Sequence, residues 1–515
     1  MHGDDQVWYG ARVLTSKAAL TLLCFWILLG ALLLIPGPLR DRLRSASDDL
    51  SAPTGATPGL PSPAPAPPTQ QKTLPAGAER LKLPVGEIAL QRFEDPGGSM
   101  AHFYRALART QAAREAGSLP RRAGRARENQ AARRAGSPGR GRTRANAVTR
   151  VLHYGDSLID LDFITAPVRR ALQKRFGDGG HGFVLAARPW RWYNHMGISM
   201  AESSGWDHFR LVGGRARDGH LGLGCAAVET HTRSWIRVTA AESARASRIE
   251  VHYLRMPGGG KLRVRVDGKR HGETIDTAAE NKQPGFKSLE VADGAHSVRV
   301  DARGAVRLFG LVLERDGPGI TWENLPLISA RFNQFVRLDQ LHWARQLQHR
   351  RPDLVLFQFG ANDTISYGGD IERYGKQVLR ALKLVRKALP RGSCLVIGPL
   401  DRLQRNSKGE LRSPRVVRIV SDRQREVALA AGCAFWDGQK AMGGRGSMRR
   451  WLKQGLVLKD FVHLNVKGSD VLGSVLEQAV LAGYDRFRSG QPRSGGAGGR
   501  SRHESSGAGR RSEQR

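Results

Sequence analysis

Short apolar runs and stretches with helical spacing alternate in two parts of the chain. The apolar runs that end in a glycine, as buried strands commonly do, are 151–155, 352–360 and 394–398. Residues 161–176 and 371–389 instead repeat their apolar positions at helical spacing. This alternation predicts an α/β fold in which helices cover both faces of a parallel sheet, a three-layer, flavodoxin-like architecture. We expect residues 148–196 and 318–487 to build it.

The stretch between these two parts has a different period. Residues 247–254, 261–266 and 297–301 largely alternate apolar and polar side chains, with Gly, Asp or Pro turns between them. Such alternation without helical spacing predicts antiparallel strands, and several of them together predict a β-sandwich. We expect residues 197–317 to form this sandwich as an insertion, because a surface loop tolerates an inserted domain.

A membrane signal and low-complexity sequence precede the α/β part. Residues 18–35 contain no charge, a length that suits a membrane-spanning helix. Without a small-x-small cleavage site after it, a retained signal anchor at 18–36 is favoured over a cleaved signal peptide. The Pro-rich sequence that follows would hold a body away from a membrane surface, so we place that body outside the cytoplasm. The remaining predicted segments are a cytoplasmic N-terminus (1–17), a Pro/Ala-rich linker (37–78), a helical lead-in (79–116), an Arg/Gly-rich insert (117–147) and a basic tail (488–515).

The 515-residue chain has a formal net charge of +35, which raises the question of a nucleic-acid partner. Residues 121–150 hold ten arginines and one glutamate, and residues 488–515 hold seven arginines and two glutamates. Both segments are rich in Gly, Ser or Ala, which predicts disordered basic arms. Because no zinc finger, basic zipper or RNP-like motif accompanies them, we expect general attraction to polyanions and no specific nucleic acid.

The four cysteines, Cys24, Cys225, Cys394 and Cys433, form no C-x-x-C pair. This spacing indicates neither a zinc site nor a redox motif. Cys394 and Cys433 fall in segments that we expect to be core, so we expect no disulfide framework. The sequence also indicates no metal cluster, and we expect no cofactor.

Three motifs follow one another in the α/β part. They are Gly155-Asp156-Ser157, Gly360-x-Asn362-Asp363 and Asp460-x-x-His463. The first two each end an apolar strand, where open α/β sheets bind ligands, and the third precedes the last helix. In this order and placement they resemble the motifs of the SGNH, or GDSL, hydrolase superfamily. Within it, the chain is similar to extracytoplasmic peptidoglycan and polysaccharide O-acetylesterases and O-acetyltransferases, whose inserted sandwich resembles a carbohydrate-binding module.

Acyl transfer explains why these residue types are needed. A serine hydroxyl attacks an ester only when a base takes its proton, which makes Ser157 the candidate nucleophile and His463 the candidate base. Asp460 would accept a hydrogen bond from the other imidazole nitrogen and complete a triad. An oxyanion hole would use the backbone N–H of Ser157, the side-chain amide of Asn362 and a further backbone N–H.

The further oxyanion donor is the point at which the chain departs from the family pattern. The family carries a glycine there, whereas this chain has Ser329. Gly180, in the turn after the first helix, is an alternative donor. We also expect Gly360, Trp190 and Trp192 to contact substrate, although the tryptophans could equally pack beneath a loop.

The resemblance implies a serine esterase that removes O-acetyl groups from an acetylated cell-envelope glycan, anchored to the inner membrane with its catalytic domain in the periplasm. An O-acetyltransferase is the first alternative, because water and a sugar hydroxyl compete for the same acyl-serine. The second alternative is a non-catalytic glycan- or polyanion-binding protein. The presence of serine, asparagine, aspartate and histidine together argues against that second alternative.

Overall fold

The structure, a computed structural model, describes residues 79–118, 147–213, 218–366 and 368–490. The predicted membrane helix at 18–36, the linker, nearly all of the Arg/Gly-rich insert and the basic tail beyond residue 490 lie outside these ranges. Within them, no helix combines the length and the apolar character that crossing a membrane requires.

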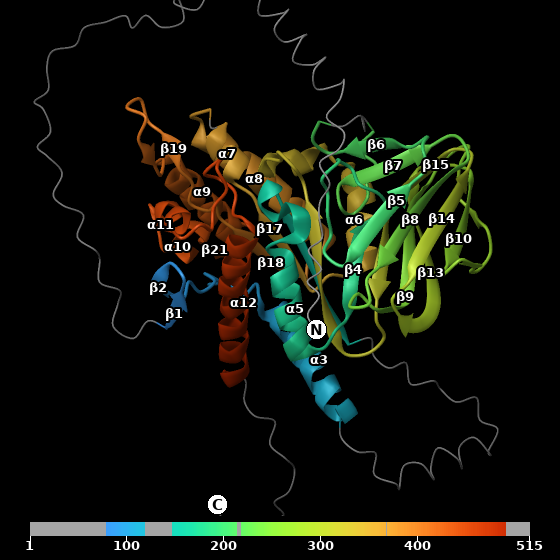
Figure 1. Cartoon of the computed structure of the whole chain (residues 1–515), viewed down its shortest axis with the longest axis horizontal. Coiled ribbons are helices and arrows are strands. Elements are labelled where there is room, and N and C mark those ends of the chain that lie inside the picture. The colour runs from blue at the N-terminus through green and yellow to red at the C-terminus, as the bar shows by residue number, and fades with distance from the viewer. Residues whose placement is uncertain (1–78, 119–146, 214–217, 367, 491–515) are drawn as a thin grey trace, which may run out of the picture. The chain divides into compact units, whose positions relative to one another are not determined.

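A five-stranded parallel sheet forms the centre of the α/β part (Figure 1). Its strand order is β16-β3-β17-β18-β21. The strands are β3 (Val148–Gly155), β16 (Gly319–Pro326), β17 (Leu354–Gln358), β18 (Ser393–Ile397) and β21 (Ala434–Trp436). Nearly all of their residues are buried, because helices cover both faces of the sheet.

Alternate side chains of each strand enter two separate cores. Val151 and Leu356 pack in a core with α3 (Ala101–Ser118), α5 (Thr165–Phe176) and α12 (Val466–Ser489). Leu152 and Phe357 point to the other face and pack with α6 (Gln340–Arg350), α8 (Ile371–Ala388) and α9 (Val416–Ala430). This arrangement confirms the predicted three-layer α/β class.

Short elements complete the α/β part. They are β1 (Arg80–Leu83), β2 (Gly86–Ala89), η1 (Ser157–Asp162), η2 (Phe332–Arg337), α7 (Ala361–Ile365), β19 (Gln404–Arg405), β20 (Leu411–Arg412), α10 (Gly438–Ala441) and α11 (Ser447–Lys453). The lead-in is more than the single helix that its sequence predicts, since the β1-β2 hairpin precedes α3.

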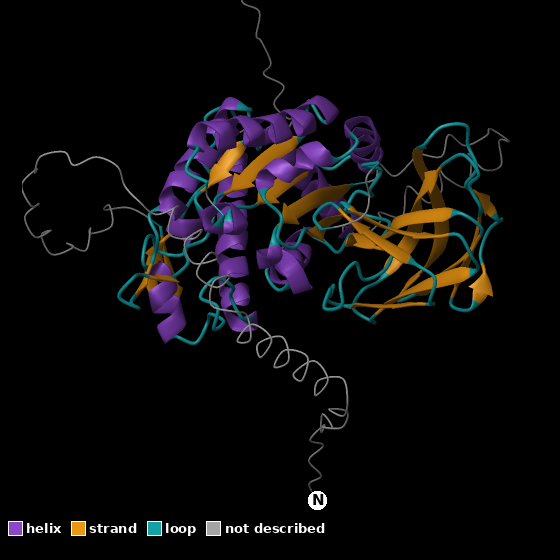
Figure 2. Cartoon of the chain, turned by 90° about the horizontal axis from the view of Figure 1, so that it is seen from above, coloured by secondary structure: helices purple, strands orange, loops and turns teal. Residues whose placement is uncertain are grey.

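Two antiparallel sheets build the strand-rich part (Figure 2), which confirms the predicted inserted sandwich. The outer sheet has the order β11-β10-β14-β8-β5 with β12 beside β10, and the inner sheet has the order β13-β9-β15-β7-β6 with β4 beside β15. Ile236 and Val300 of the outer sheet meet Val251 and Leu311 of the inner sheet in a shared core. The bounds are β4 (Gly180–Leu185), β5 (Ile198–Glu202), β6 (Asp207–Arg210), β7 (Ala226–Thr230), β8 (Ser234–Ala240), β9 (Ala246–Arg255), β10 (Lys261–Val266), β11 (Lys269–Arg270), β12 (Ile275–Asp276), β13 (Gln283–Gly294), β14 (Ser297–Arg303) and β15 (Val306–Glu314).

Strand β4 lies ahead of residue 197 in the chain, yet it pairs antiparallel with β15. Phe183 and Leu185 pack in the α/β core, whereas Val184 packs in the core of the sandwich. A strand that is buried on both faces has no polar alternation, so its sequence resembles that of a parallel strand. The antiparallel part therefore begins earlier than the boundary expected at residue 197.

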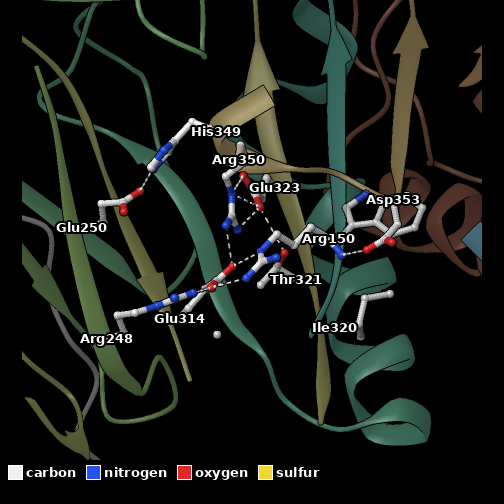
Figure 3. Close-up of polar contacts among 12 residues, drawn as sticks. Arg150, Arg248, Glu250, Glu314, Ile320, Thr321, Glu323, His349, Arg350 and Asp353 are labelled. Carbon is white, nitrogen blue, oxygen red and sulfur yellow. Dashed lines mark hydrogen bonds and ion pairs between the residues drawn. The ribbon is translucent and has the colours of Figure 1, made fainter. Parts of the chain in front are cut away.

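A buried group of charged side chains joins the inner sheet to the α/β part (Figure 3). We call Arg150, Arg248, Glu314, Glu323 and Arg350 the ion network. Arg150 Nε donates to Glu314 Oε1 at 2.7 Å, and Arg350 Nε donates to Glu323 Oε1 at 3.0 Å. Arg248 and Arg350 also pair with Glu314. Burial alone would raise the pKa of Glu314, but the three arginines hold that pKa well below its usual range.

Cys394 and Cys433 form a disulfide bond, which corrects the expectation of none. Cys394 lies on β18, and Cys433 immediately precedes the neighbouring strand β21. The two residues are 39 positions apart in sequence, so only the pairing of the two strands reveals that they are neighbours. Cys225 is buried and unbonded.

Candidate active site

Three strands of the parallel sheet end at the same level, and the loops after them carry predicted site residues. Gly155 at the end of β3 pairs with Pro326 of β16 on one side and with Gln358 of β17 on the other. The loops that follow carry Ser157, Ser329 and Asn362. The sheet therefore brings these three residues to one rim, the carboxyl edge at which α/β folds bind ligands.

Asp156 ties two of these loops together. Its side chain is fully buried and accepts hydrogen bonds from the backbone N–H groups of Leu158 at 3.0 Å and Ala361 at 3.3 Å. Burial raises the pKa of Asp156 to about 6, although these N–H groups favour its charged form. Asp156 thus fixes the loop of Ser157 against the loop of Asn362.

The backbone just after Ser157 is strained. Leu161 and Asp162 have φ values of 63° and 61°, a left-handed conformation that costs a non-glycine residue roughly 1–2 kcal/mol. Asp162 is buried, and its Oδ2 accepts a hydrogen bond from Arg169 Nη2 at 2.6 Å. The sequence predicts a helix from residue 161, but α5 begins only at Thr165, because this strained turn precedes it. The buried ion pair offsets the strain and holds the turn in place.

Ser157, His463 and Asp460 form a chain of two short hydrogen bonds. Ser157 Oγ lies 2.7 Å from His463 Nε2, and His463 Nδ1 lies 2.7 Å from Asp460 Oδ2. The other carboxylate oxygen of Asp460 accepts from the backbone N–H groups of Val462 and His463, both at 2.9 Å. Partial burial acts to raise the pKa of Asp460, but these hydrogen bonds outweigh it and the pKa lies below its usual value. A charged Asp460 can therefore orient the imidazole and stabilise its protonated form.

The three expected N–H donors lie on the loops at this rim. The backbone N–H groups of Ser157 and Ser329 have no acceptor among the described residues. Asn362 Nδ2 donates one hydrogen bond to the carbonyl of Ala330 at 3.1 Å, which leaves its second N–H available. Ser329 has a φ of 58°, a conformation that glycine adopts without strain. A glycine would adopt this conformation without strain, so the expected equivalence of Ser329 to the family glycine stays a prediction that its backbone permits.

Gly180 does not meet this rim, which corrects its assignment as an alternative donor. Its N–H donates to Asp178 Oδ1 at 2.8 Å, and it pairs with Glu314 at the start of β4. Glu314 in turn binds Arg150 near the amino end of β3, whereas Ser157 follows the carboxyl end of that strand.

The other expected substrate contacts differ in exposure. Trp190 is buried and packs edge-on against Tyr193, which fits the packing interpretation, whereas Trp192 is 60% exposed. Gly360 has a φ of 142°, and a Cβ there would lie only 2.7 Å from Pro399 Cβ. Glycine is therefore required at position 360 by the turn itself, and contact with substrate stays a prediction.

Two acidic residues near the rim were not singled out from the sequence. Asp160 accepts a hydrogen bond from Trp190 Nε1 at 3.3 Å, and burial raises its pKa to about 6. Asp363 is buried beside Asp156, and burial together with that neighbouring carboxylate raises its pKa to about 7. Asp363 belongs to the second motif, so its place in that motif was the available signal. Asp160 lies just before the predicted helix start at residue 161, and no motif includes it.

One group of described residues could hold a metal ion, although the sequence indicates none. Glu250 and His252 on β9 and His349 on α6 have their ligand atoms within 4.8 Å of one another. His252 Nε2 and His349 Nε2 lie 2.8 and 3.0 Å from Glu250 Oε1, and Figure 3 shows the contact with His349. The donor types suit zinc. Because hydrogen bonds already satisfy the same atoms, the group needs no ion to be stable.

Comparison with known proteins adds a family and a fold. Residues 298–471 match the GDSL-like Lipase/Acylhydrolase family, a span that contains Asn362, Asp460 and His463 but begins after Ser157. A solved peptidoglycan O-acetylesterase is 22% identical with a TM-score of 0.61, covering 77% of this chain and 99% of that one. A family two carbohydrate esterase from Clostridium thermocellum, in complex with cellohexaose, is 10% identical with a TM-score of 0.23, covering 50% of this chain and 95% of that one. No curated protein sequence matches the chain.

The family match and the architecture agree with each other. The matched span runs from β14 into α12 and so contains the second half of the α/β part, while the solved O-acetylesterase shares the overall fold. Residues 298–471 are similar to GDSL-like lipases and acylhydrolases, and this likeness, together with the shared fold, supports an enzyme that acts on ester bonds.

Proposed function

We propose that the protein removes O-acetyl groups from an acetylated cell-envelope glycan, with Ser157 as nucleophile, His463 as general base and Asp460 as the group that orients the imidazole. The single observation that carries this proposal is the unbroken pair of 2.7 Å contacts from Ser157 Oγ through His463 to Asp460. Geometry of this kind is what an activated serine requires.

The first half of the reaction forms an acetyl-serine. Ser157 Oγ bonds to the acetyl carbonyl carbon while its proton passes to His463 Nε2. The carbonyl oxygen becomes an oxyanion, which accepts hydrogen bonds from the N–H groups of Ser157 and Ser329 and from Asn362 Nδ2. When this intermediate collapses, the bond from carbon to the sugar oxygen breaks, and His463 returns the proton to the departing hydroxyl.

The second half releases acetate. A water molecule gives a proton to His463 and attacks the acetyl carbon, and the same donors bind the second oxyanion. Collapse breaks the bond to Ser157 Oγ, which regains its proton from His463. The histidine and aspartate side chains are 32% and 47% exposed, so water reaches the acyl-serine.

Two observations support the substrate class and the compartment. The solved protein with the same fold is a peptidoglycan O-acetylesterase, and its likeness spans nearly its whole length. The Cys394–Cys433 disulfide fits an oxidising, extracytoplasmic compartment, because cytosolic thiols are kept reduced. We therefore place the catalytic domain in the periplasm, and the anchor at 18–36 remains a sequence prediction.

The test measures acetate release from O-acetylated peptidoglycan and turnover of a chromogenic acetyl ester by the full chain. Ser157→Ala should lower both by at least about 10⁴-fold, because loss of an activated nucleophile removes most of the catalysed rate. Ser474→Ala, an exposed serine on α12, is the matched control and should leave both activities unchanged.

The two substrates separate the parts of the proposal. Equal turnover of the chromogenic ester by wild type and Ser157→Ala would remove the nucleophile assignment. Serine-dependent turnover of that ester without acetate release from peptidoglycan would keep the mechanism and refute the glycan. Transfer of the acetyl group to an added deacetylated glycan, in place of acetate release, would favour the transferase.

A further inference from the structure

The solvent face of the outer sheet carries a dense set of basic side chains. On β10, the inward residues Leu262 and Val264 are buried, and the residues between them point outward, as strand geometry requires. The outward positions on and beside β8, β10 and β14 form what we call the basic face: Arg233, Arg237, Lys261, Arg263, Arg265, Arg299 and Arg303.

The strand register places like charges directly opposite one another. Arg299 on β14 pairs with Arg265 of β10 on one side and with Arg237 of β8 on the other. Farther along the same two strands, Lys261 of β10 is opposite Arg303 of β14. Like charges in directly opposite positions destabilise a sheet. The two rows of cations therefore do not stabilise the sheet through contacts with one another.

Acidic partners for these cations are few. Asp301 accepts from Arg265 Nε at 3.2 Å and from Arg299 Nε at 2.8 Å, and Lys261 pairs with Asp276. The other four arginines of the basic face, Arg233, Arg237, Arg263 and Arg303, have no carboxylate partner among the described residues. Their guanidinium groups are exposed and free to bind an external anion.

The basic face also has a groove and an aromatic surface. The groove has a volume of about 760 Å³, and its lining includes Trp235 together with the seven cations. The guanidinium carbons of Arg237 and Arg299 lie 5.3 and 4.5 Å from the centroid of the Trp235 ring. These cation–π contacts hold two guanidinium groups at the groove, where they can bind the charged groups of a ligand.

We propose that the basic face is a docking site for an acidic glycan, a linear carbohydrate polymer that bears carboxylate groups. The groove crosses three strands, so it matches an extended chain rather than a single small anion. Only the strand network of the outer sheet is required for this binding. The inference therefore goes beyond the proposed esterase reaction and does not depend on it.

The aromatic content of the groove favours a glycan over a nucleic acid. Single-stranded nucleic acids bind to basic grooves in which successive bases stack on several aromatic side chains. Trp235 is the single aromatic residue in the lining of this groove. One aromatic residue among seven cations suits a polymer whose charges, and not its rings, supply most of the contacts.

The experiment measures binding of fluorescently labelled oligogalacturonate to the full chain at low salt. The variant Arg237→Gln/Arg263→Gln/Arg303→Gln should bind about tenfold more weakly, as expected for three exposed ion contacts. The matched control Arg380→Gln/Lys383→Gln/Lys387→Gln removes the same charge from exposed positions on α8 and should change affinity by less than about threefold. Neutral dextran should not compete, and turnover of the chromogenic ester should be unchanged in both variants.

Three results would overturn the proposal. The first is the absence of oligogalacturonate binding by wild type. The second is an equal loss of affinity in the two triple variants, which would assign the binding to net charge alone. The third is tighter binding of an oligothymidylate of equal charge that depends on the same three arginines. Since ester turnover is followed in parallel, failure here is distinct from failure of the esterase mechanism.

Discussion

The two ends of β3 differ in whether the polar groups near them are already bound within the protein. Beyond its carboxyl end, His463 and Asp460 are partly exposed, and the backbone N–H groups of Ser157 and Ser329 lack an acceptor among the described residues. Near its amino end, Arg150 belongs to the ion network, in which Glu314 is fully buried and binds three arginines. The first group keeps open hydrogen-bond capacity, and the second has used its capacity within the protein.

This difference separates groups that act on a substrate from groups that hold the fold. Donors that face solvent can bind an oxyanion without first breaking an internal contact. A saturated buried network cannot do so, and it instead fixes the position of the inner sheet against the α/β part. We expect substitutions at the catalytic rim to lower turnover, and substitutions in the ion network to lower stability.

The largest effect is expected from Glu314→Gln in the ion network. It removes one buried negative charge and leaves Arg150, Arg248 and part of Arg350 without compensation. Breaking a buried ion pair by removing one partner destabilises a protein by about 3–5 kcal/mol, measured as the free energy of unfolding in denaturant. Glu290→Gln, on an exposed position of β13, is the control and should change this free energy by less than about 0.5 kcal/mol. A variant that stays stable but loses esterase turnover would break the comparison.

Asn362→Ala should have the next largest effect, and on turnover alone. Loss of one oxyanion donor lowers kcat by about 100- to 1000-fold, equivalent to about 2.7–4 kcal/mol of barrier. The melting temperature should change little, because Asn362 contributes only one hydrogen bond to the carbonyl of Ala330. Asn281→Ala, on an exposed part of the insertion, should leave kcat unaffected. A loss confined to KM would mean that Asn362 binds substrate rather than the transition state.

A sharper test, because it depends on pH, comes from Asp363→Asn. Asp363 lies at the rim but is buried, and its pKa of about 7 exceeds the ordinary value of 3.8. Between these pH values the folded state keeps a proton that the unfolded state has lost, so stability falls as pH rises through this window. The variant cannot ionise, so it should nearly match wild type at pH 4 and exceed it by about 4 kcal/mol at pH 8, where the full difference between the two pKa values acts. Asp316→Asn, an exposed position, should show no such pH-dependent gain. An identical pH profile for Asp363→Asn and wild type would show that burial does not control this carboxyl.

Features set by local sequence were predictable, and those set by distant pairing were not. The apolar runs ending at Gly155 and Gly360 marked strand ends, so the meeting of their loops followed from the geometry of parallel sheets. The Cys394–Cys433 bond and the ion network join residues that are far apart in sequence, and no spacing rule identifies them. The left-handed turn at Leu161 and Asp162 also escaped prediction, because its cause is the buried contact with Arg169.

Strand β15 faces two interiors at once, since every one of its residues is buried. Leu308 and Leu311 complete the core of the sandwich, while Phe309 and Val312 complete that of the α/β part. The insertion therefore cannot be removed without exposing the core of the α/β part. A replacement of the insertion must retain β4 and β15, because their loss would open that core to water.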